Sequence, residues 1–202
     1  ERGYLYIQLG TLYRTNDKKK NRTLFREMFK LAIDDFSYVI KNAPDRGDDN
    51  DDGLVYTSKA DGYRQRGNAY SWNDDFIRAC KDWKKSLKKA KKGDLVYVDP
   101  PYMPIRIDNT TFTDYFTDGF TIDDQIDLAN SLAIAAKKGV RIIASNHDTE
   151  GNPNVREIYN NAAILAKIKP PEIYSIDVSR TISCKGKGRL KVKEVLIFMT
   201  GE

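Results

Sequence analysis

Hydrophobic residues in the first forty positions recur at the three- and four-residue spacing of an amphipathic helix. They form one group within Tyr4–Leu12 and another within Leu24–Val39, and the polar run Asn16–Arg22 lies between the groups. An apolar stripe at this spacing is typical of a helix that packs one side against a neighbour. We therefore predict two helices joined by a basic connection.

Residues 42–62 break this pattern. They contain Pro44, three glycines and the acidic run Asp45–Asp52, a composition typical of a loop, with one short strand expected at Leu54–Thr57. The chain is therefore expected to divide into a helical and loop region over residues 1–75 and an α/β region over residues 76–202.

The second region begins with a strongly amphipathic pattern. Its apolar residues repeat at intervals of four and three: Phe76, Cys80, Trp83, Leu87 and Ala90. Eight Lys and Arg residues lie within Ile77–Lys92, which places a basic surface opposite the apolar side of the predicted helix. Such a surface is ordinarily a solvated one, and contact with a polyanion such as DNA is the alternative.

Further along the chain, apolar runs typical of strands alternate with helical patterns. The expected elements are a strand at Asp94–Val98, a helix from about Asp123 to Lys137, a strand at Val140–Ala144, a helix near Asn154–Lys167, and strands near Ile173–Val178 and Val192–Met199. This alternation predicts an α/β fold with a mostly parallel sheet. The last two strands are separated by a polar, glycine-containing link without a helical pattern, so we expect them to pair antiparallel.

Bulk composition narrows the function only a little. The chain has 202 residues, 40% of them hydrophobic, which is enough for one main domain with a smaller attached piece. A net charge of +5 suits a polyanionic partner without requiring one. Cys80 and Cys184 form no CxxC pair and His147 is the single histidine, so no metal site or disulfide framework is indicated. Because neither a membrane span nor a signal peptide is found, the expected compartment is the cytoplasm.

The run Asp99-Pro100-Pro101-Tyr102 stands at the end of a predicted strand. Ligands of open α/β sheets bind beyond the carboxyl ends of the strands, so unusual residues at this place are candidates for chemistry. By average residue usage, the tetrapeptide arises by chance in roughly one chain in a thousand of this length. A proline-stiffened strand exit with a capping aspartate is the alternative interpretation.

These residue types suit the methylation of an exocyclic amino group. The lone pair of adenine N6 is delocalised into the ring, so this nitrogen attacks poorly unless acceptors bind its hydrogens. Asp99 offers a carboxylate oxygen and Pro100 a main-chain carbonyl, which consecutive prolines hold rigidly because they fix φ and donate no N–H. Tyr102 offers a flat face on which a base extruded from the duplex can stack. A methyl donor is then required, and S-adenosylmethionine is the natural one.

Residues 94–199 resemble the corresponding part of Dam-type DNA adenine methyltransferases. The segments that match in order are Asp99–Tyr102, Asn109–Tyr115, Gly119–Thr121 with Gln125, Ser145–Thr149, Arg180–Ser183 and Glu194–Leu196. The resemblance implies an α/β fold: a partial S-adenosylmethionine-dependent methyltransferase sheet of the Rossmann-like type, with an antiparallel C-terminal hairpin and a helical N-terminal target-recognition region. It also implies a site-specific adenine-N6 methyltransferase that acts on a flipped base of double-stranded DNA.

The resemblance further assigns roles to single residues. Asp99, Pro100, Pro101 and Tyr102 are the expected catalytic residues, and Asp99 is also expected near the cofactor. Contacts with DNA are implied for Asn109, Thr110 and Thr111 at phosphates, for Tyr63, Arg64 and Arg66 in a hairpin over Tyr63–Asn68 that probes the major groove, and for Arg180.

Two of these assignments have a simpler alternative, and His147, within a matching segment, needs an interpretation of its own. Tyr63–Asn68 has the composition of a solvated arginine loop as well as that of a recognition hairpin. Arg180 is equally suited to holding the active-site loop. For His147 we favour the orienting of a loop over acid–base chemistry.

One expected motif of the family is missing. No Phe-x-Gly-x-Gly cofactor motif precedes the recognition region, since Gly3 and Gly10 are isolated. We favour a fragment of a longer protein, which the start at Glu1 without a methionine supports. The alternatives are a complementing chain that supplies the missing part and a protein that binds DNA without catalysis. A monomer is expected unless such a complementing chain is needed. A fragment without its first strands is expected to expose the strand before Asp99 as a sheet edge.

Two other functions stand beside adenine methylation. A catalytically inactive DNA-binding fragment or paralogue of the same fold is the main alternative. Methylation of cytosine N4, or of an RNA or protein amide, is a third, although the motifs that follow the tetrapeptide argue against it.

Overall fold

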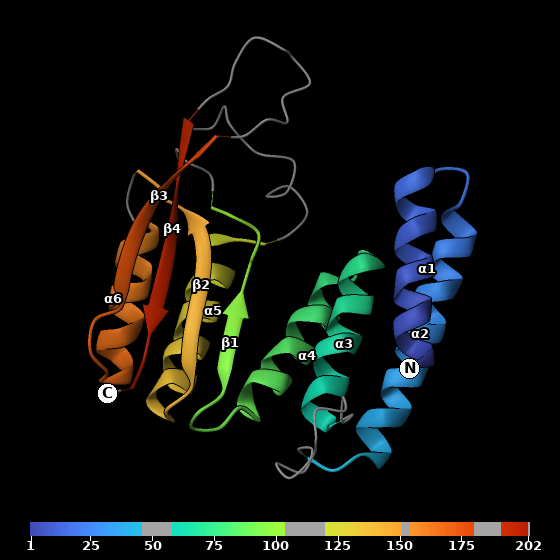
Figure 1. Cartoon of the computed structure of the whole chain (residues 1–202), viewed down its shortest axis with the longest axis horizontal. Helices are drawn as coiled ribbons and strands as arrows, with labels where there is room; N and C mark the ends of the chain where they lie inside the picture. Colours follow the sequence, from blue (N-terminus) through green and yellow to red (C-terminus); the bar gives the residue numbers. More distant parts are fainter. Residues whose placement is uncertain (46–57, 104–119, 151–153, 180–190, 202) are drawn as a thin grey trace. The chain divides into compact units, whose positions relative to one another are not determined.

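Two compact units, Glu1–Ala90 and Lys91–Glu202, make up the chain (Figure 1). The computed structural model describes residues 1–45, 58–103, 120–150, 154–179 and 191–201. Helices α1 (Arg2–Asn16), α2 (Arg22–Asn42), α3 (Lys59–Trp72) and α4 (Phe76–Lys88) belong to the first unit. The second unit holds β1 (Leu95–Val98), α5 (Ile122–Lys137), β2 (Arg141–His147), α6 (Val155–Ala166), β3 (Glu172–Ser179) and β4 (Lys191–Met199).

Most elements lie where the hydrophobic pattern predicts them, and the division between the units is displaced. It falls after α4, at Ala90, rather than after residue 75, because α4 packs on α3. The strand expected at Leu54–Thr57 lies outside the described residues. None of the described helices is both long enough and apolar enough to cross a bilayer.

The predicted helix pair is confirmed as α1 and α2, which pack against each other. Their close approach depends on Gly3 and Gly10, the buried residues of α1. A Cβ atom at Gly10 would lie 2.6 Å from the Phe29 ring, and one at Gly3 would lie 2.9 Å from the Phe36 ring. The buried side of α1 is therefore its glycine side, whereas three leucines of the expected apolar stripe are exposed: Leu5, Leu9 and Leu12.

The expected hairpin over Tyr63–Asn68 is wrong, because this segment is the middle of α3. Ser58 caps the helix, since its side-chain oxygen accepts a hydrogen bond from the Asp61 N–H at 3.1 Å. A Cβ atom at Gly67, within this segment, would lie 2.5 Å from the Trp83 indole. In this unit the glycine serves close helix packing instead of a change of chain direction.

An ion pair lies in the interface between α3 and α4. Arg66 donates to both carboxylate oxygens of Asp82, at 2.6 Å from Nε and 3.0 Å from Nη2. Its third nitrogen, Nη1, donates to Ser37 Oγ of α2 at 2.9 Å. The guanidinium thus joins three helices, and all of its nitrogens have a partner within the unit.

The Asp82→Ala substitution is expected to destabilise the helical unit by about 3 kcal/mol, because it leaves the partly buried guanidinium of Arg66 without a counter-charge. Urea denaturation followed by circular dichroism measures this loss. Asp34→Ala, an exposed position on α2, is the matched control and is expected to change stability by less than about 0.5 kcal/mol. Equal effects of the two substitutions would contradict a structural role for the pair.

The four described strands form one sheet in the order β1-β2-β4-β3. β1 and β2 are parallel, and the antiparallel pairing predicted for the last two strands is confirmed. The expectation of a mostly parallel sheet needs correction. β4 lies between β2 and β3 and runs antiparallel to both, so β1–β2 is the single parallel pairing among the described strands. The short link after β3 explains this, since it allows a hairpin but no helical crossover.

Helices α5 and α6 pack together against one face of the sheet (Figure 1). The opposite face exposes large apolar side chains, among them Leu95 (56%), Tyr97 (62%) and Tyr174 (55%). Within the described strands, β1 pairs only with β2, so its other edge is open. The exposed edge expected for the strand before Asp99 is therefore present in the described sheet.

Candidate active site at the ends of β1 and β2

The tetrapeptide leaves the sheet at the carboxyl end of β1, directly beside the carboxyl end of β2. The register Val98↔Ala144 places Asp99 next to the last three residues of β2. Asp99 is exposed and Pro100 is buried, while Tyr102 lies between these extremes. The segment ends on Met103, whose side chain is buried. An exposed carboxylate and a partly exposed aromatic ring thus stand on a segment with two buried anchor points.

Ser145 fixes the carboxylate. Its Oγ donates to Asp99 Oδ1 at 2.8 Å, and Tyr97 OH lies 3.3 Å from the same Oγ. Because the single Ser145 hydroxyl hydrogen is directed to the carboxylate, the Tyr97 hydroxyl is the donor in the second bond. The position of the Asp99 side chain is therefore determined by two hydroxyl groups on the exposed face of the sheet.

Asn146 fixes the far end of the segment from the helix-covered face. Its Oδ1 accepts the backbone N–H of Met103 at 2.9 Å and that of His147, also at 2.9 Å. Its Nδ2 donates to Gln125 Oε1 of α5 at 3.3 Å, and Gln125 Nε2 donates to Tyr159 OH of α6 at 3.3 Å. The three side chains are fully buried, and burial raises the pKa of Tyr159 so that its hydroxyl stays neutral.

His147 holds the same residue, Met103, through its carbonyl group. Its Nδ1 lies 2.8 Å from Met103 O, and since a carbonyl can only accept, Nδ1 carries the proton in this bond. The His147 ring also meets the Tyr102 ring edge-on, with centroids 4.9 Å apart at 78°. The role expected for this histidine, orienting a loop, is confirmed by these contacts.

Three consecutive residues of β2 therefore form hydrogen bonds with both ends of the segment Asp99–Met103. Ser145 holds the carboxylate, Asn146 the Met103 N–H and His147 the Met103 carbonyl. Burial around Tyr102 raises its pKa, so the phenol is neutral at ordinary pH. The arrangement presents a fixed acceptor and a fixed aromatic ring at one edge of the sheet.

The chain after β2 is tied to α6 and β3 by a further ion pair. Arg156 donates from Nε and Nη2 to the two Asp148 oxygens at 2.8 and 2.9 Å, and Ser175 Oγ donates to Asp148 Oδ2 at 2.8 Å. Thr149 Oγ1 accepts the Val155 N–H at 2.8 Å. These bonds fix the strand end that carries Ser145–His147.

Hydrogen bonds from Arg156 hold the pKa of Asp148 below its ordinary value. The ionised carboxylate therefore adds stability above the unfolded-state pKa of about 4, and this contribution is lost as the pH falls through the lower folded-state pKa. We expect the difference in melting temperature between wild type and Asp148→Asn to be constant from pH 5 to 7 and to shrink below about pH 4. A difference that does not change over this range would contradict the ion pair.

The other predicted contact residues are not part of this cluster. Tyr63, Arg64 and Arg66 belong to α3 of the helical unit. Asn109, Thr110, Thr111 and Arg180 lie outside the described residues. Sequence reasoning gave no role to Gln125 and missed Met103 and Tyr159; the only signal was Gln125 among the motifs of the resembling family.

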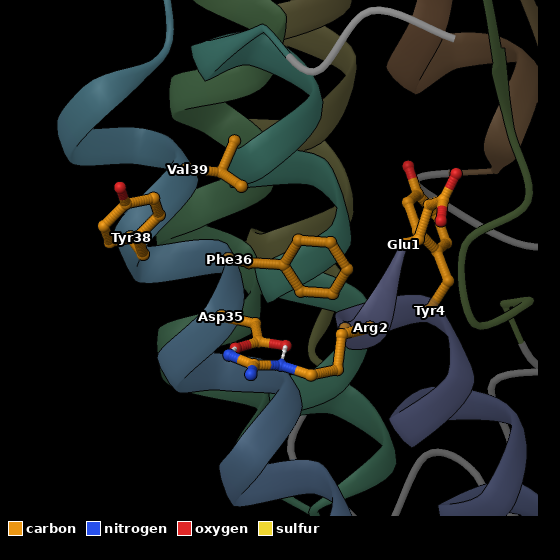
Figure 2. Close-up of a pocket in the computed structure, with 8 residues that line it drawn as sticks. Glu1, Arg2, Tyr4, Asp35, Phe36, Tyr38 and Val39 are labelled. Atoms are coloured by element: carbon orange, nitrogen blue, oxygen red, sulfur yellow. Dashed lines mark hydrogen bonds and ion pairs between the residues drawn. The ribbon is translucent and has the colours of Figure 1, made fainter.

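A pocket lies between α1 and α2, and it contains none of the predicted site residues (Figure 2). Arg2 and Asp35 face each other across it, with Nη2 and Oδ1 2.6 Å apart, and Arg2 lowers the pKa of Asp35 by donating to it. The pocket walls include the Phe36 ring. Because the charges of Arg2 and Asp35 neutralise each other, this wall of the pocket offers little attraction to a charged ligand.

A nucleotide-like cofactor generally needs a glycine-lined turn at the carboxyl edge of such a sheet. Among the described residues, the glycines with positive φ are Gly93 at 92° and Gly139 at 85°, and they precede β1 and β2 at the opposite edge. Asp99 is a suitable acceptor, but the described residues form no cradle of this kind. They do not by themselves fit a complete cofactor site.

Residues 13–174 match the family described as D12 class N6 adenine-specific DNA methyltransferase. The match runs from the end of α1 into β3 and includes Asp99–Met103 and the end of β2. It therefore covers both units of the chain.

Individual relatives agree. A DNA adenine methylase of Vibrio cholerae is 34% identical over 122 residues, which are 60% of this chain and 39% of the relative. A DNA adenine methylase of Serratia marcescens is 36% identical over 127 residues, 62% of this chain and 42% of the relative. A type II methyltransferase of Lactococcus lactis subsp. cremoris is 33% identical over 120 residues, 59% and 38%. The matched part thus spans about two fifths of the length of these relatives.

Proposed function

The chain belongs to the D12 class N6 adenine-specific DNA methyltransferases, and we propose that its residues 99–102 hold the target adenine of a site-specific DNA methyltransferase. The observation that carries the proposal is the double anchoring of this segment by Ser145, Asn146 and His147. Methyl transfer requires the adenine amino group to be held in one orientation. The anchored segment provides the groups that hold it before the base arrives.

Asp99 and Pro100 act on the nucleophile. The Asp99 carboxylate and the Pro100 carbonyl accept the two N6 hydrogens, which draws the nitrogen toward a tetrahedral shape and localises its lone pair. Ser145 occupies Asp99 Oδ1 at 2.8 Å, so Oδ2 is the oxygen better placed for adenine. No strong base is required, because the N6 proton becomes acidic once the nitrogen has taken up the methyl group.

Tyr102 positions the ring of the base. A base that reacts at N6 has to leave the duplex stack, and an aromatic side chain compensates for the lost stacking. The edge-on contact with His147 limits rotation of the Tyr102 ring. The proposed adenine pocket is therefore bounded by a ring of fixed orientation and a carboxylate of fixed position.

S-adenosylmethionine is the proposed methyl donor, as is general for methyltransferases, and it supplies an activated methyl group. Asp99 is the described residue we propose for contact with it. The remainder of its site is not formed by the described residues, so either further parts of the protein or a complementing chain supply it. For the fold, we propose that the described sheet is part of a Rossmann-like methyltransferase sheet.

Double-stranded DNA is the proposed partner, and the helical unit is the proposed target-recognition region. Arg64 is better placed than Arg66 for a DNA contact, because its side chain is exposed and pairs only locally with Asp61, whereas Arg66 is engaged with Asp82. Tyr63 lies beside Arg64 on the same helix. Asn109, Thr110, Thr111 and Arg180 remain proposed DNA contacts.

A catalytically inactive DNA-binding protein is the second candidate. It is favoured by the position of Gly93 and Gly139 away from the carboxyl edge of the sheet. Incubation of the full-length protein with labelled S-adenosylmethionine and plasmid, followed by nucleoside analysis, separates the two. Label in N6-methyladenine supports the methyltransferase, and DNA binding without label supports the second candidate.

We expect Asp99→Ala to reduce methyl transfer by on the order of 100-fold or more, because it removes a charged acceptor made available before the reaction. DNA affinity is expected to change little, since contacts with phosphates dominate it. Single-turnover transfer and a filter-binding titration measure the two effects. Asp177→Ala, an exposed aspartate of β3, is the control and is expected to leave both unchanged. Normal turnover in Asp99→Ala would remove the proposed mechanism.

A further inference from the structure

We propose that Gln125 of α5 and Tyr159 of α6 are positioning residues for the adenine site, acting through Asn146 on the Tyr102–Met103 peptide. The inference rests on the proposed function and adds two residues that touch neither base nor cofactor. Both belong to helices that cover one face of the sheet, α5 and α6 (Figure 1).

The connection is a continuous line of hydrogen bonds. Tyr159 OH meets Gln125 Nε2 at 3.3 Å, Gln125 Oε1 meets Asn146 Nδ2 at 3.3 Å, and Asn146 Oδ1 meets Met103 N at 2.9 Å. Every member of the line is buried, with no exposed surface on Gln125, Asn146 or Tyr159. The line therefore ends on the backbone of the residue that follows Tyr102.

The direction of each bond is set by the one before it. Asn146 Oδ1 accepts two backbone N–H groups, which only an oxygen can do, so Nδ2 is the donor toward Gln125. Gln125 must then present Oε1 to Asn146, and its Nε2 has to donate to Tyr159. Both amide orientations are thus set from the Met103 and His147 N–H groups outward, and the Tyr159 oxygen is the acceptor that Gln125 Nε2 needs at the end of the line.

Apolar side chains at these three buried positions would need no hydrogen-bond partners. Polar groups without exposed surface are costly unless all of them have partners, and a fully satisfied network is rigid and specific. Here the network spans two helices and a strand to reach one peptide of the segment Asp99–Met103. Its most direct effect is on that peptide, since Asn146 accepts the Met103 N–H, while His147 holds the following peptide through Met103 O.

The consequence for the reaction concerns the Tyr102 ring. With both polar groups of Met103 fixed, the chain direction at Tyr102 is fixed as well, and the ring meets His147 in one orientation. If Asn146 rotates, the Met103 N–H loses its acceptor and this end of the segment gains freedom. The ring that stacks on adenine then samples positions in which N6 is displaced from Asp99.

The test is Tyr159→Phe in the full-length protein, with Tyr174→Phe as the matched control. Tyr174 loses the same hydroxyl from an exposed site on β3, where it donates to Glu172. For Tyr159→Phe we expect kcat to fall about 10-fold, with KM for DNA changed by less than about twofold, as displacement of a prearranged group predicts. Hydrogen–deuterium exchange of the peptide that contains Tyr102 and Met103 is expected to accelerate. Tyr174→Phe is expected to change none of these.

A purely structural role is distinguished by a double-mutant cycle. If Tyr159 acts through the Tyr102 ring, Tyr159→Phe has little further effect on kcat in a Tyr102→Ala background, whereas independent destabilisation gives the same factor in both backgrounds. Equal effects of Tyr159→Phe on kcat in the two backgrounds would overturn this inference and leave the proposed function standing. Unchanged kcat and unchanged exchange in Tyr159→Phe would do the same. A wild-type protein that transfers no methyl group would overturn the proposed function, and with it the effect of Tyr159 on the reaction. In that case, faster exchange in Tyr159→Phe would still show that Tyr159 restrains the backbone at Met103.

Discussion

The candidate site depends on one buried amide oxygen. Asn146 Oδ1 accepts hydrogen bonds from two backbone N–H groups, those of Met103 and His147. It joins the end of β2 to the chain leaving β1, and it does so where the parallel pairing of these strands brings their carboxyl ends together. Ser145 and His147 act from the exposed face of the sheet and Asn146 from the helix-covered face. A loop that leaves a sheet edge is thereby held from both sides, without requiring any regular structure of its own.

The position of this site was predictable because it depends on local sequence. A short apolar strand followed by Asp99-Pro100-Pro101-Tyr102 indicates a strand exit with special residues, and the rule for open sheets assigns chemistry to that place. Likewise, the helix covering the sheet was predicted over Asp123–Lys137, close to the observed Ile122–Lys137, because its periodic pattern is local and Gly139 ends it.

The rest depends on contacts between residues distant in sequence. Gln125 and Tyr159 are 34 positions apart, and each fits an ordinary helical pattern, so nothing local shows that Tyr159 meets Gln125 or that Gln125 meets Asn146. The insertion of β4 between β2 and β3 is a choice of pairing partner that alternation of elements does not specify. Gly67 had two opposite local meanings, a turn or a close helix contact, and only the position of Trp83 decides between them. The same holds for Arg66, whose fork suits DNA but is occupied by Asp82.

The two units also differ in how their polar groups are used. In the helical unit, Arg66 is committed to the packing of three helices, whereas in the α/β unit the buried side chains of Ser145 and Asn146 hold the segment Asp99–Met103. The central claim, that this segment holds the target base, is tested most directly by a crystal structure of the full-length protein bound to duplex DNA containing its target site. The account predicts an adenine extruded from the duplex and stacked on Tyr102, with N6 within hydrogen-bond distance of Asp99 and the Pro100 carbonyl. An adenine bound elsewhere, or one whose N6 points away from Asp99, would contradict it.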